Sequence, residues 1–192
     1  SEKERMRGLY VMGENPAMSD PDLTHARSAL AHLEHLVVQD IFLTETALLA
    51  DVVLPASAWP EKTGTVTNTD RMVQLGRSAV QPPGGAQADL WIIQQLATRF
   101  DLNWQYAGEY HGVGAIFEEM RTAMGAPFSG ISWQRLQAEH SVVYPCVSEG
   151  VAGQGVVFID RFPTASGRMR LVPTAYKGPT VSVDPEYPMA MI

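Results

Sequence analysis

The sequence predicts an α/β fold in which a parallel βαβ portion is followed by a mixed α+β portion. Short apolar runs in the first 58 residues stop at turn-forming or helix-capping residues, and helically spaced segments separate them. Strands that alternate with helices in this way favour a parallel sheet with right-handed crossovers. Beyond residue 58 helical spacing dominates, and from residue 156 the apolar residues recur at every second position, which predicts strands.

The first apolar run, Leu9 to Met12, is predicted to be a buried strand. Gly13 to Pro16 forms the sharp turn after it, because Gly and Asn tolerate unusual backbone angles. Ser19 or Asp20 is expected to cap the next helix, with Pro21 at its first position. That helix has an apolar face at three-to-four spacing, which we expect to pack on the sheet: Leu23, Ala26, Leu30 and Leu33.

Two further strands complete the parallel portion. Leu36 to Ile41 is predicted to be the second strand, and Thr44 is expected to cap a short helix through Leu49. Val52 to Leu54 is the third strand and ends at Pro55. The expected arrangement of this portion is Rossmann-like.

The rest of the chain is predicted to be a mixture of loops, helices and one hairpin. The polar, turn-rich stretch 59–71 is expected to be an irregular loop, and such long ordered loops usually serve a function. Helices are expected at 88–100, 113–124 and 133–138, and a β-hairpin is expected from 156–159 and 167–173. The inward face of the first of these helices is predicted to be Leu90, Ile93, Leu96, Ala97 and Phe100.

Composition restricts the classes of protein to consider. The chain has 192 residues, of which 45% are apolar, so it can bury a core. A net charge of -7 disfavours nucleic acid as a partner, and no apolar run is long enough to cross a membrane. The acidic balance and the absence of a signal-peptide pattern favour a cytoplasmic protein. The single Cys146 cannot form an intrachain disulfide, and we interpret it as a structural thiol.

Polar side chains at the ends of the predicted strands are the candidate binding residues, because an open α/β sheet binds ligands at that edge. Asn15 and Ser19 follow the first strand and could meet a nucleotide, although an ordinary capped turn explains them equally. Gln39 and Asp40 end the second strand, and the two oxygens of an Asp can accept hydrogen bonds from the ring N–H and exocyclic amine of a guanine. Helix capping is the alternative for Asp40, and also for Asp89.

The sequence indicates no catalytic set and no metal site. His25, His32 and His35 share one predicted helix, but no Asp or Glu pattern completes a metal site with them, so we interpret them as a solvated face. His111 and His140 lack a nucleophile at a recognisable spacing.

Several linked blocks resemble the molybdopterin oxidoreductase family, in the same order and at the same spacing. Residues 9–16, 38–47 and 50–55 match three of them. A later block contains Trp59, Glu61, Gly64, Thr65, Thr67, Asn68, Asp70, Arg71 and Gln74. Within the family the chain is most similar to catalytic α subunits of molybdenum- or tungsten-dependent formate dehydrogenases, whose later motifs look like Asp89 to Trp91, Tyr144 to Cys146 and Phe162 to Gly167.

The resemblance implies a cofactor and a reaction. In this family two pyranopterin guanine dinucleotides (bis-MGD) hold molybdenum or tungsten, and the full enzyme oxidises formate to carbon dioxide and passes electrons to iron–sulfur clusters and electron-transfer subunits. Asn68, Asp70 and Arg71 match a family motif whose role is bracing a loop. The positions of this sequence that match dinucleotide contacts are Asn15, Ser19, Gln39, Asp40 and Asp89, with Thr44 as a neighbour at a helix end.

The resemblance also implies that the chain is a fragment of a larger multidomain subunit. Residues 1–58 would be the C-terminal half of a dinucleotide-binding domain, 59–155 a loop-rich helical region that packs with the iron–sulfur part, and 156–192 a hairpin and linker to a C-terminal domain. The family's metal ligand and cluster motif have no match here, and Cys146 does not match the ligand, so we expect the chain alone to be inactive. The alternatives are another family enzyme such as a nitrate reductase, and a cofactor-free subunit related to respiratory complex I.

Overall fold

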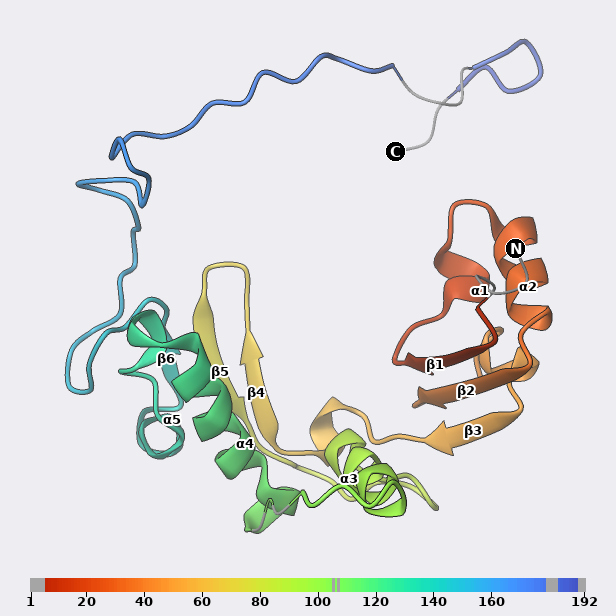
Figure 1. The fold of residues 1–192 in the computed structure, drawn as a ribbon, viewed down its shortest axis with the longest axis horizontal. Coiled ribbons are helices and arrows are strands. Elements are labelled where there is room, and N and C mark those ends of the chain that lie inside the picture. The colour runs from red at the N-terminus through yellow and green to blue at the C-terminus, as the bar shows by residue number, and fades with distance from the viewer. Residues whose placement is uncertain (1–5, 105, 107, 179–182, 190–192) are drawn as a thin grey trace. The chain divides into compact units, whose positions relative to one another are not determined.

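The computed structural model describes residues 6–104, 106, 108–178 and 183–189 (Figure 1). These residues divide into two compact units, 1–155 and 156–192. Unit 1 contains every helix and strand of the described residues. In the described part of the chain, no helix is both long and apolar enough to cross a membrane.

A parallel sheet of β1 (Gly8–Met12), β2 (His35–Asp40) and β3 (Val52–Pro55) opens the chain, with the strands in sequence order. Met12 lies opposite Gln39, and Gln39 lies opposite Leu54. All three strands therefore end at one edge of the sheet. The α/β fold class expected from the sequence is confirmed, and the three strands lie within two residues of their predicted bounds.

Two helices, α1 (Pro16–Ser19) and α2 (Leu23–Ala31), cover one face of this sheet (Figure 1). The cap of α2 is Asp22, whose carboxylate accepts a hydrogen bond from the amide of His25 at 3.0 Å. The prediction of Ser19 or Asp20 as the cap was wrong because Pro16 starts an earlier short helix, which leaves Asp20 extended. The core beneath the helices consists of Val11, Ala17, Leu30, Leu36, Val38 and Ala47.

A second, antiparallel sheet has the order β4-β5-β6 and consists of β4 (Gly64–Thr67), β5 (Met72–Gly76) and β6 (Ser141–Val143). The short helix η3 (Trp59–Glu61) precedes it. The prediction of an irregular loop over 59–71 was therefore wrong. Thr65, Val66 and Thr67 are residues that favour strands, but the third strand of the sheet, β6, lies far along the chain, and this long-range pairing has no local signal.

The helices beyond the second sheet are α3 (Asp89–Arg99), α4 (Glu109–Met124) and α5 (Trp133–Glu139), with η4 (Ala126–Phe128) between the last two. Tyr110, His111 and Gly112 have positive φ, so regular helix in α4 begins at Val113, as predicted. The predicted inward face of α3 was wrong at one position. Phe100 is 73% exposed because it caps the helix end, whereas Ile92 is buried.

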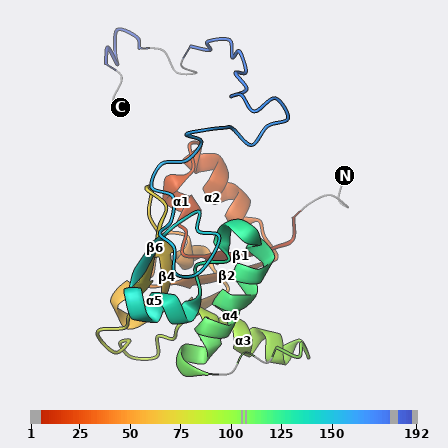
Figure 2. The same cartoon turned by 90° about the vertical axis from the view of Figure 1, so that its left-hand side faces the viewer.

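An aromatic and aliphatic core joins α4 and α5 to the second sheet, and Figure 2 shows these elements from the side. Gly114 permits the close approach of α4, since a Cβ there would meet the ring of Trp133. Cys146 is buried in this core, which agrees with its interpretation as a structural thiol. The buried members of the core are Val73, Phe117, Phe128, Ile131, Leu136, Val142 and Cys146.

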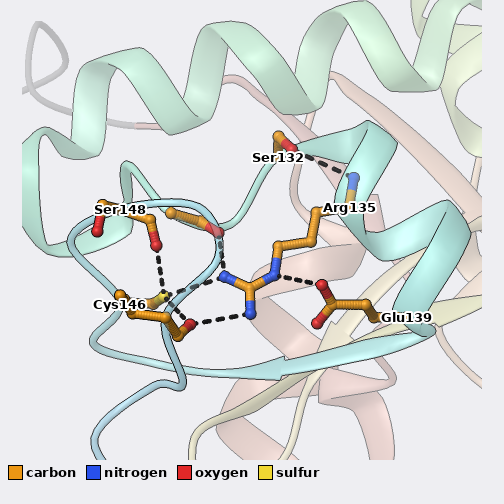
Figure 3. A network of polar contacts seen from close by, with 7 residues as sticks. Ser132, Arg135, Glu139, Cys146 and Ser148 are labelled. Atoms are coloured by element: carbon orange, nitrogen blue, oxygen red, sulfur yellow. Dashed lines mark hydrogen bonds and ion pairs between the residues drawn. The ribbon is translucent and has the colours of Figure 1, made fainter.

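Arg135 holds the segment that follows β6 (Figure 3). Its guanidinium donates to the carbonyl oxygens of Gly130 at 2.8 Å and Val151 at 2.9 Å, and to Cys146 Sγ at 3.3 Å. Its Nε pairs with Glu139 at 3.0 Å. Burial lowers the pKa of Arg135, but its hydrogen bonds to Glu139 and Cys146 and their charges outweigh burial and raise it. The guanidinium is therefore a fixed cation inside this unit.

Arg71, in the turn between β4 and β5, braces the same segment. Its Nε donates to the carbonyl of Tyr144 at 3.1 Å, and its Nη2 donates to those of Gln154 at 3.2 Å and Gly155 at 2.8 Å. The amide of Met72, next in the chain, donates to the side chain of Asn68 at 2.9 Å and to that of Asp70 at 3.2 Å. Asn68 and Asp70 therefore brace their own loop, as expected, whereas Arg71 braces the segment after β6.

Unit 2 contains no strand among its described residues, so the predicted β-hairpin is absent. The turn is present: the amide of Phe162 donates to the carbonyl of Gly167 at 3.1 Å. Ile159 and Leu171, which the hairpin pattern would have buried on one face, are highly exposed. A two-stranded ribbon without a surface to pack on is only marginally stable in water, which explains the difference.

Candidate functional site

The loops that follow β1, β2 and β3 meet at the carboxyl edge of the parallel sheet. Gly13 donates its amide to the carbonyl of Gln39 at 2.9 Å, and Ala56 donates its amide to the carbonyl of Asp40 at 3.0 Å. After η3, β4 and β5 the chain returns to this edge, where an isolated parallel bridge pairs Gln87, just before α3, with Ala56, just after β3. This edge is where sheets of this kind bind ligands.

Gln39 is the centre of a polar relay at this edge. Its side chain is fully buried and lies between Tyr10 of β1 and Asp89 of α3. The Tyr10 hydroxyl donates to Gln39 Oε1, and Gln39 Nε2 donates to Asp89 Oδ1 at 2.7 Å. The structure thus brings together two of the predicted site residues, Gln39 and Asp89, that are 50 positions apart in the chain.

Asp89 accepts from two donors, one on each carboxylate oxygen. Gln39 occupies Oδ1, and the ammonium group of Lys62 pairs with Oδ2. The side chains of Lys62 and Asp89 are 33% and 28% exposed, so each remains in contact with solvent. Burial raises the pKa of Tyr10, and the negative charge of Asp89 raises it further. The carboxylate is therefore held in place from the sheet side and faces outward beside a cation.

Asp40 behaves differently from Asp89. Its Oδ1 accepts from the amides of Ile41 at 2.6 Å and Phe42 at 3.4 Å, a local cap at the end of the strand. No hydrogen bond to its Oδ2 comes from the part of the chain that the structure describes. Asp40 therefore caps the end of β2 and not the next helix, η2 (Ala47–Leu49), and its other oxygen is available to a ligand.

Asn15 joins the turn after β1 to the loop after β2. Its Oδ1 accepts from the amide of Thr46 at 3.2 Å and from the Thr46 hydroxyl at 2.7 Å, and its Nδ2 donates to Glu45 at 2.8 Å. The hydrogen bond from Asn15 lowers the pKa of Glu45, and hydrogen bonding to its own backbone amide contributes. Thr44 Oγ1 accepts from the amide of Ala47 at 3.2 Å, as expected for a cap. Asn15 and Thr44 therefore hold the loops in place.

Ser19 does not join this group of contacts. It is the last residue of α1 and is exposed, and no hydrogen bond of its side chain is found within the described ranges. Its hydroxyl is thus open to solvent.

A cavity of about 760 Å³ lies beside the carboxylate of Asp89. It lies in the part of unit 1 that follows β3, and both members of the Lys62–Asp89 ion pair line it. Residues from η3, from β4, from the 81–90 stretch and from the start of α4 complete its walls, among them Trp59, Thr65, Gln87 and His111. A space of this size accepts a drug-sized or nucleotide-sized molecule.

Two residues of the site were missed from the sequence. Lys62 was read as part of an irregular loop, although its position next to Glu61 and before β4 is what places its ammonium group on Asp89. Ser57 follows β3, is fully buried, and its hydroxyl has no hydrogen-bond partner among the described residues. A buried hydroxyl without a partner is costly, and a ligand or water that bonds to it would remove that cost.

The histidines do not form a site. His35 lies near Asp51, with 3.8 Å between Nδ1 and Oδ2, at an exposed position. Within the described residues, no group of three or more His, Cys, Asp and Glu side chains could hold a metal ion.

A parallel α/β sheet with polar side chains gathered at its carboxyl edge is typical of proteins that bind nucleotides. A family model described as molybdopterin oxidoreductase matches residues 1–99, and the chain belongs to this family. It is 44% identical over 188 residues to the alpha subunit of F420-dependent formate dehydrogenase from Methanocaldococcus jannaschii, covering 98% of this chain and 27% of the relative. It is 34% identical over 189 residues to the assimilatory nitrate reductase catalytic subunit from Bacillus subtilis, and this match covers 96% of this chain and 26% of that relative.

Among solved structures, acetylene hydratase from Pelobacter acetylenicus matches with a TM-score of 0.57 and 22% identity, over 72% of this chain and 18% of that one. This likeness concerns the fold alone. The chain spans about a quarter of the length of the curated relatives that it matches.

The family implies a molybdopterin cofactor, and the residues at the sheet edge fit the nucleotide part of such a group. The open oxygen of Asp40 and the partly exposed carboxylate of Asp89 are acceptors of the kind that a base or a ribose would need, and the unpartnered hydroxyl of Ser57 lies in the chain directly after β3. The ammonium group of Lys62 supplies a cation beside them. This donor and acceptor set suits a nucleotide.

Proposed function

We propose that this chain is part of the catalytic subunit of a formate dehydrogenase, an enzyme that oxidises formate to carbon dioxide. The Methanocaldococcus jannaschii relative, a formate dehydrogenase alpha subunit by name, aligns with 98% of the chain. The observation that carries the proposal is the meeting of Gln39, Asp89 and Lys62 beside a nucleotide-sized cavity, at the sheet edge where the family's cofactor would bind.

In this proposal the cofactor is bis-molybdopterin guanine dinucleotide with molybdenum or tungsten, and this segment contacts its nucleotide part. When bound, the cofactor supplies the metal centre that takes two electrons from formate. Asp40 and Asp89 accept hydrogen bonds from guanine or ribose, and Gln39 orients Asp89. Asn15 and Thr44 keep the loops after β1 and β2 in position, and Ser19 offers a hydroxyl at the rim.

The remaining parts of the enzyme lie outside this chain in the proposal. These parts are the iron–sulfur cluster, the metal ligand and the electron-transfer subunits. The 192-residue chain alone is therefore expected to be inactive. A cytoplasmic location, expected from the acidic composition, belongs to the same proposal, and cell fractionation tests it.

The decisive experiment uses the protein expressed from its complete gene. Metal analysis, pterin-nucleotide analysis and formate-dependent dye reduction are measured on the full-length protein and on the 192-residue chain. We expect the full-length protein to contain molybdenum or tungsten and guanine dinucleotide and to oxidise formate. We expect the 192-residue chain to show none of these. Asp40→Ala should lower the cofactor content, while Asp20→Ala, a matched exposed carboxylate, should not. A full-length protein that lacks pterin and metal would overturn the proposal and favour the cofactor-free subunit.

A nitrate reductase is the second candidate, because the Bacillus subtilis relative with that name aligns with 96% of the chain. The same preparation separates the two. Dye-coupled reduction of nitrate, with no oxidation of formate, would replace the formate assignment and leave the cofactor assignment in place.

A further inference from the structure

We propose that Tyr10 is a positioning residue of the nucleotide site, which sets, through Gln39, the direction in which Asp89 presents its carboxylate. This inference rests on the proposed function, because it concerns how the same site is held ready for its nucleotide. It begins from two hydrogen bonds in series. The Tyr10 hydroxyl donates to Gln39 Oε1, and Gln39 Nε2 donates to Asp89 Oδ1 at 2.7 Å.

These side chains meet on the face of the parallel sheet that lies opposite α1 and α2. Val11 and Val38 belong to the core beneath those helices, and side chains alternate between the two faces along a strand. Tyr10 and Gln39, each next to one of these valines in the chain, therefore share the other face. Asp89, the first residue of α3, contacts Gln39 there. The series of contacts thus crosses from β1 over β2 to α3.

Only one orientation of the Gln39 amide satisfies its two partners. Asp89 forms an ion pair with Lys62, and an ionised carboxylate accepts hydrogen bonds but cannot donate them. The amide must therefore turn Nε2 toward Asp89 and Oε1 toward β1, where a donor is required. Tyr10 provides that donor. Because Gln39 is fully buried, loss of the phenol O–H would leave a buried acceptor without its partner.

The protonation state of Tyr10 decides whether this orientation holds. An ionised phenol is an acceptor, so it would attract Nε2 of Gln39 and turn Oε1 toward Asp89. Two acceptors that face each other repel, and the carboxylate would move toward Lys62, its other partner. A nucleotide that needs the present direction of the carboxylate would then bind more weakly.

The surroundings of Tyr10 keep its hydroxyl protonated. Burial raises the pKa of Tyr10, and the negative charge of Asp89 raises it further. Lys62, which pairs with Asp89, is the cation on that side. His35 shares this face of β2 but lies at the opposite end of the strand from Gln39. The two hydrogen bonds are therefore both in place at neutral pH.

The first test uses the full-length protein prepared without cofactor, with GDP as the probe in isothermal titration calorimetry. Tyr10→Phe should weaken GDP binding about fivefold or more, which is the effect of losing one hydrogen bond. Tyr176→Phe, at a highly exposed position in unit 2, is the matched control and should bind GDP as the wild type does. In an Asp89→Asn background, Tyr10→Phe should change the affinity by less than about twofold, because the group that Tyr10 positions is already replaced. Independent effects of the two changes would overturn the inference.

A pH profile provides a readout that a merely structural role of Tyr10 would not change. A trifluorinated tyrosine keeps the shape of tyrosine but has a more acidic phenol, and it is incorporated in place of Tyr10. This protein should bind GDP as the wild type does at acidic pH and should weaken to the level of Tyr10→Phe as the phenol ionises. The same residue in place of Tyr176 is the control, since ionisation of guanine itself affects both proteins alike. Thermal unfolding of each variant checks that the fold is kept.

The outcomes separate this inference from the proposed function. Identical pH profiles for the two fluorinated proteins would overturn the positioning role, while guanine dinucleotide in the full-length enzyme would still support the proposed function. A wild-type protein that takes up the dinucleotide yet does not bind GDP would overturn the role as well. A full-length protein that never contains the dinucleotide would remove the proposed function and this inference together.

Discussion

Replacing Arg135 by methionine should open the segment that follows β6. Methionine keeps much of the apolar stem but removes every donor, so Cys146 Sγ and the carbonyl of Val151, the two acceptors in that segment, lose their hydrogen bonds to the charged guanidinium. At roughly 1.5 kcal/mol for each hydrogen bond to a charged group, the loss is about 3 kcal/mol. A loss of about 3 kcal/mol changes the equilibrium constant between the closed and open segment about a hundredfold. The closed segment should therefore open about a hundred times more often.

Cys146 reports this opening directly, because the residue is 2% exposed and its thiol takes part in the same network (Figure 3). The assay is the rate of alkylation of Cys146, followed by peptide mass spectrometry, under conditions in which labelling tracks the open population. Arg99→Met is the matched control, since among the described residues the hydrogen bonds of Arg99 go to Gln95 of its own helix, and Arg99 lies at an exposed position. An alkylation rate for the Arg135 variant within threefold of the wild type would refute the reasoning.

Three further changes have expected outcomes. Asp22→Ala should destabilise α2 by about 1 kcal/mol through loss of its cap, seen as faster hydrogen exchange in that helix. Gly153→Ala should release the segment after β6 and make it cleave faster in limited proteolysis, because the added methyl would overlap the backbone carbonyl of Val143 in that strand. Gly155→Ala is the control and should leave the cleavage rate unchanged, because its added methyl has no atom within contact distance. Because Asn15 lowers the folded pKa of Glu45, this contact stabilises the fold above the unfolded pKa of about 4.3 and loses that contribution as pH falls through the folded value. An NMR titration of Glu45 that is unchanged in Asn15→Leu would contradict it.

The parallel sheet could be predicted because its signals are local. Buried parallel strands are continuous apolar runs, and the residues that stop them, such as Gly13 and Pro55, are visible in the sequence. The cap at Thr44 follows from the same kind of local pattern. The second sheet was missed because β5 pairs with β6 across the whole helical region, so its core depends on contacts that no short window contains.

The sequence predicted some residues of the site, but not which side chains form hydrogen bonds or ion pairs with one another. The sequence singles out Gln39 and Asp89 separately, and the strand-end position of Gln39 has a physical reason. Their hydrogen bond depends on how the chain returns after β3, which the sequence alone does not specify. Lys62 was missed for the same reason, since a lysine in a polar loop has no signal until its carboxylate partner is placed beside it. The hairpin prediction failed in the opposite way: the local alternation at 156–173 is present in the sequence, but its apolar residues, such as Ile159 and Leu171, are exposed and no strand forms among the described residues.

The two guanidinium groups that hold the segment after β6 bond mainly to main-chain oxygens. Every amino acid carries such an oxygen, so Arg71 and Arg135 specify the path of this segment without specifying most of its side chains. The exposed positions between the two attachment points, such as Glu149, are therefore suitable sites for introducing a fluorophore or an affinity peptide. A label placed there should leave the path of the segment unchanged as long as both arginines are kept.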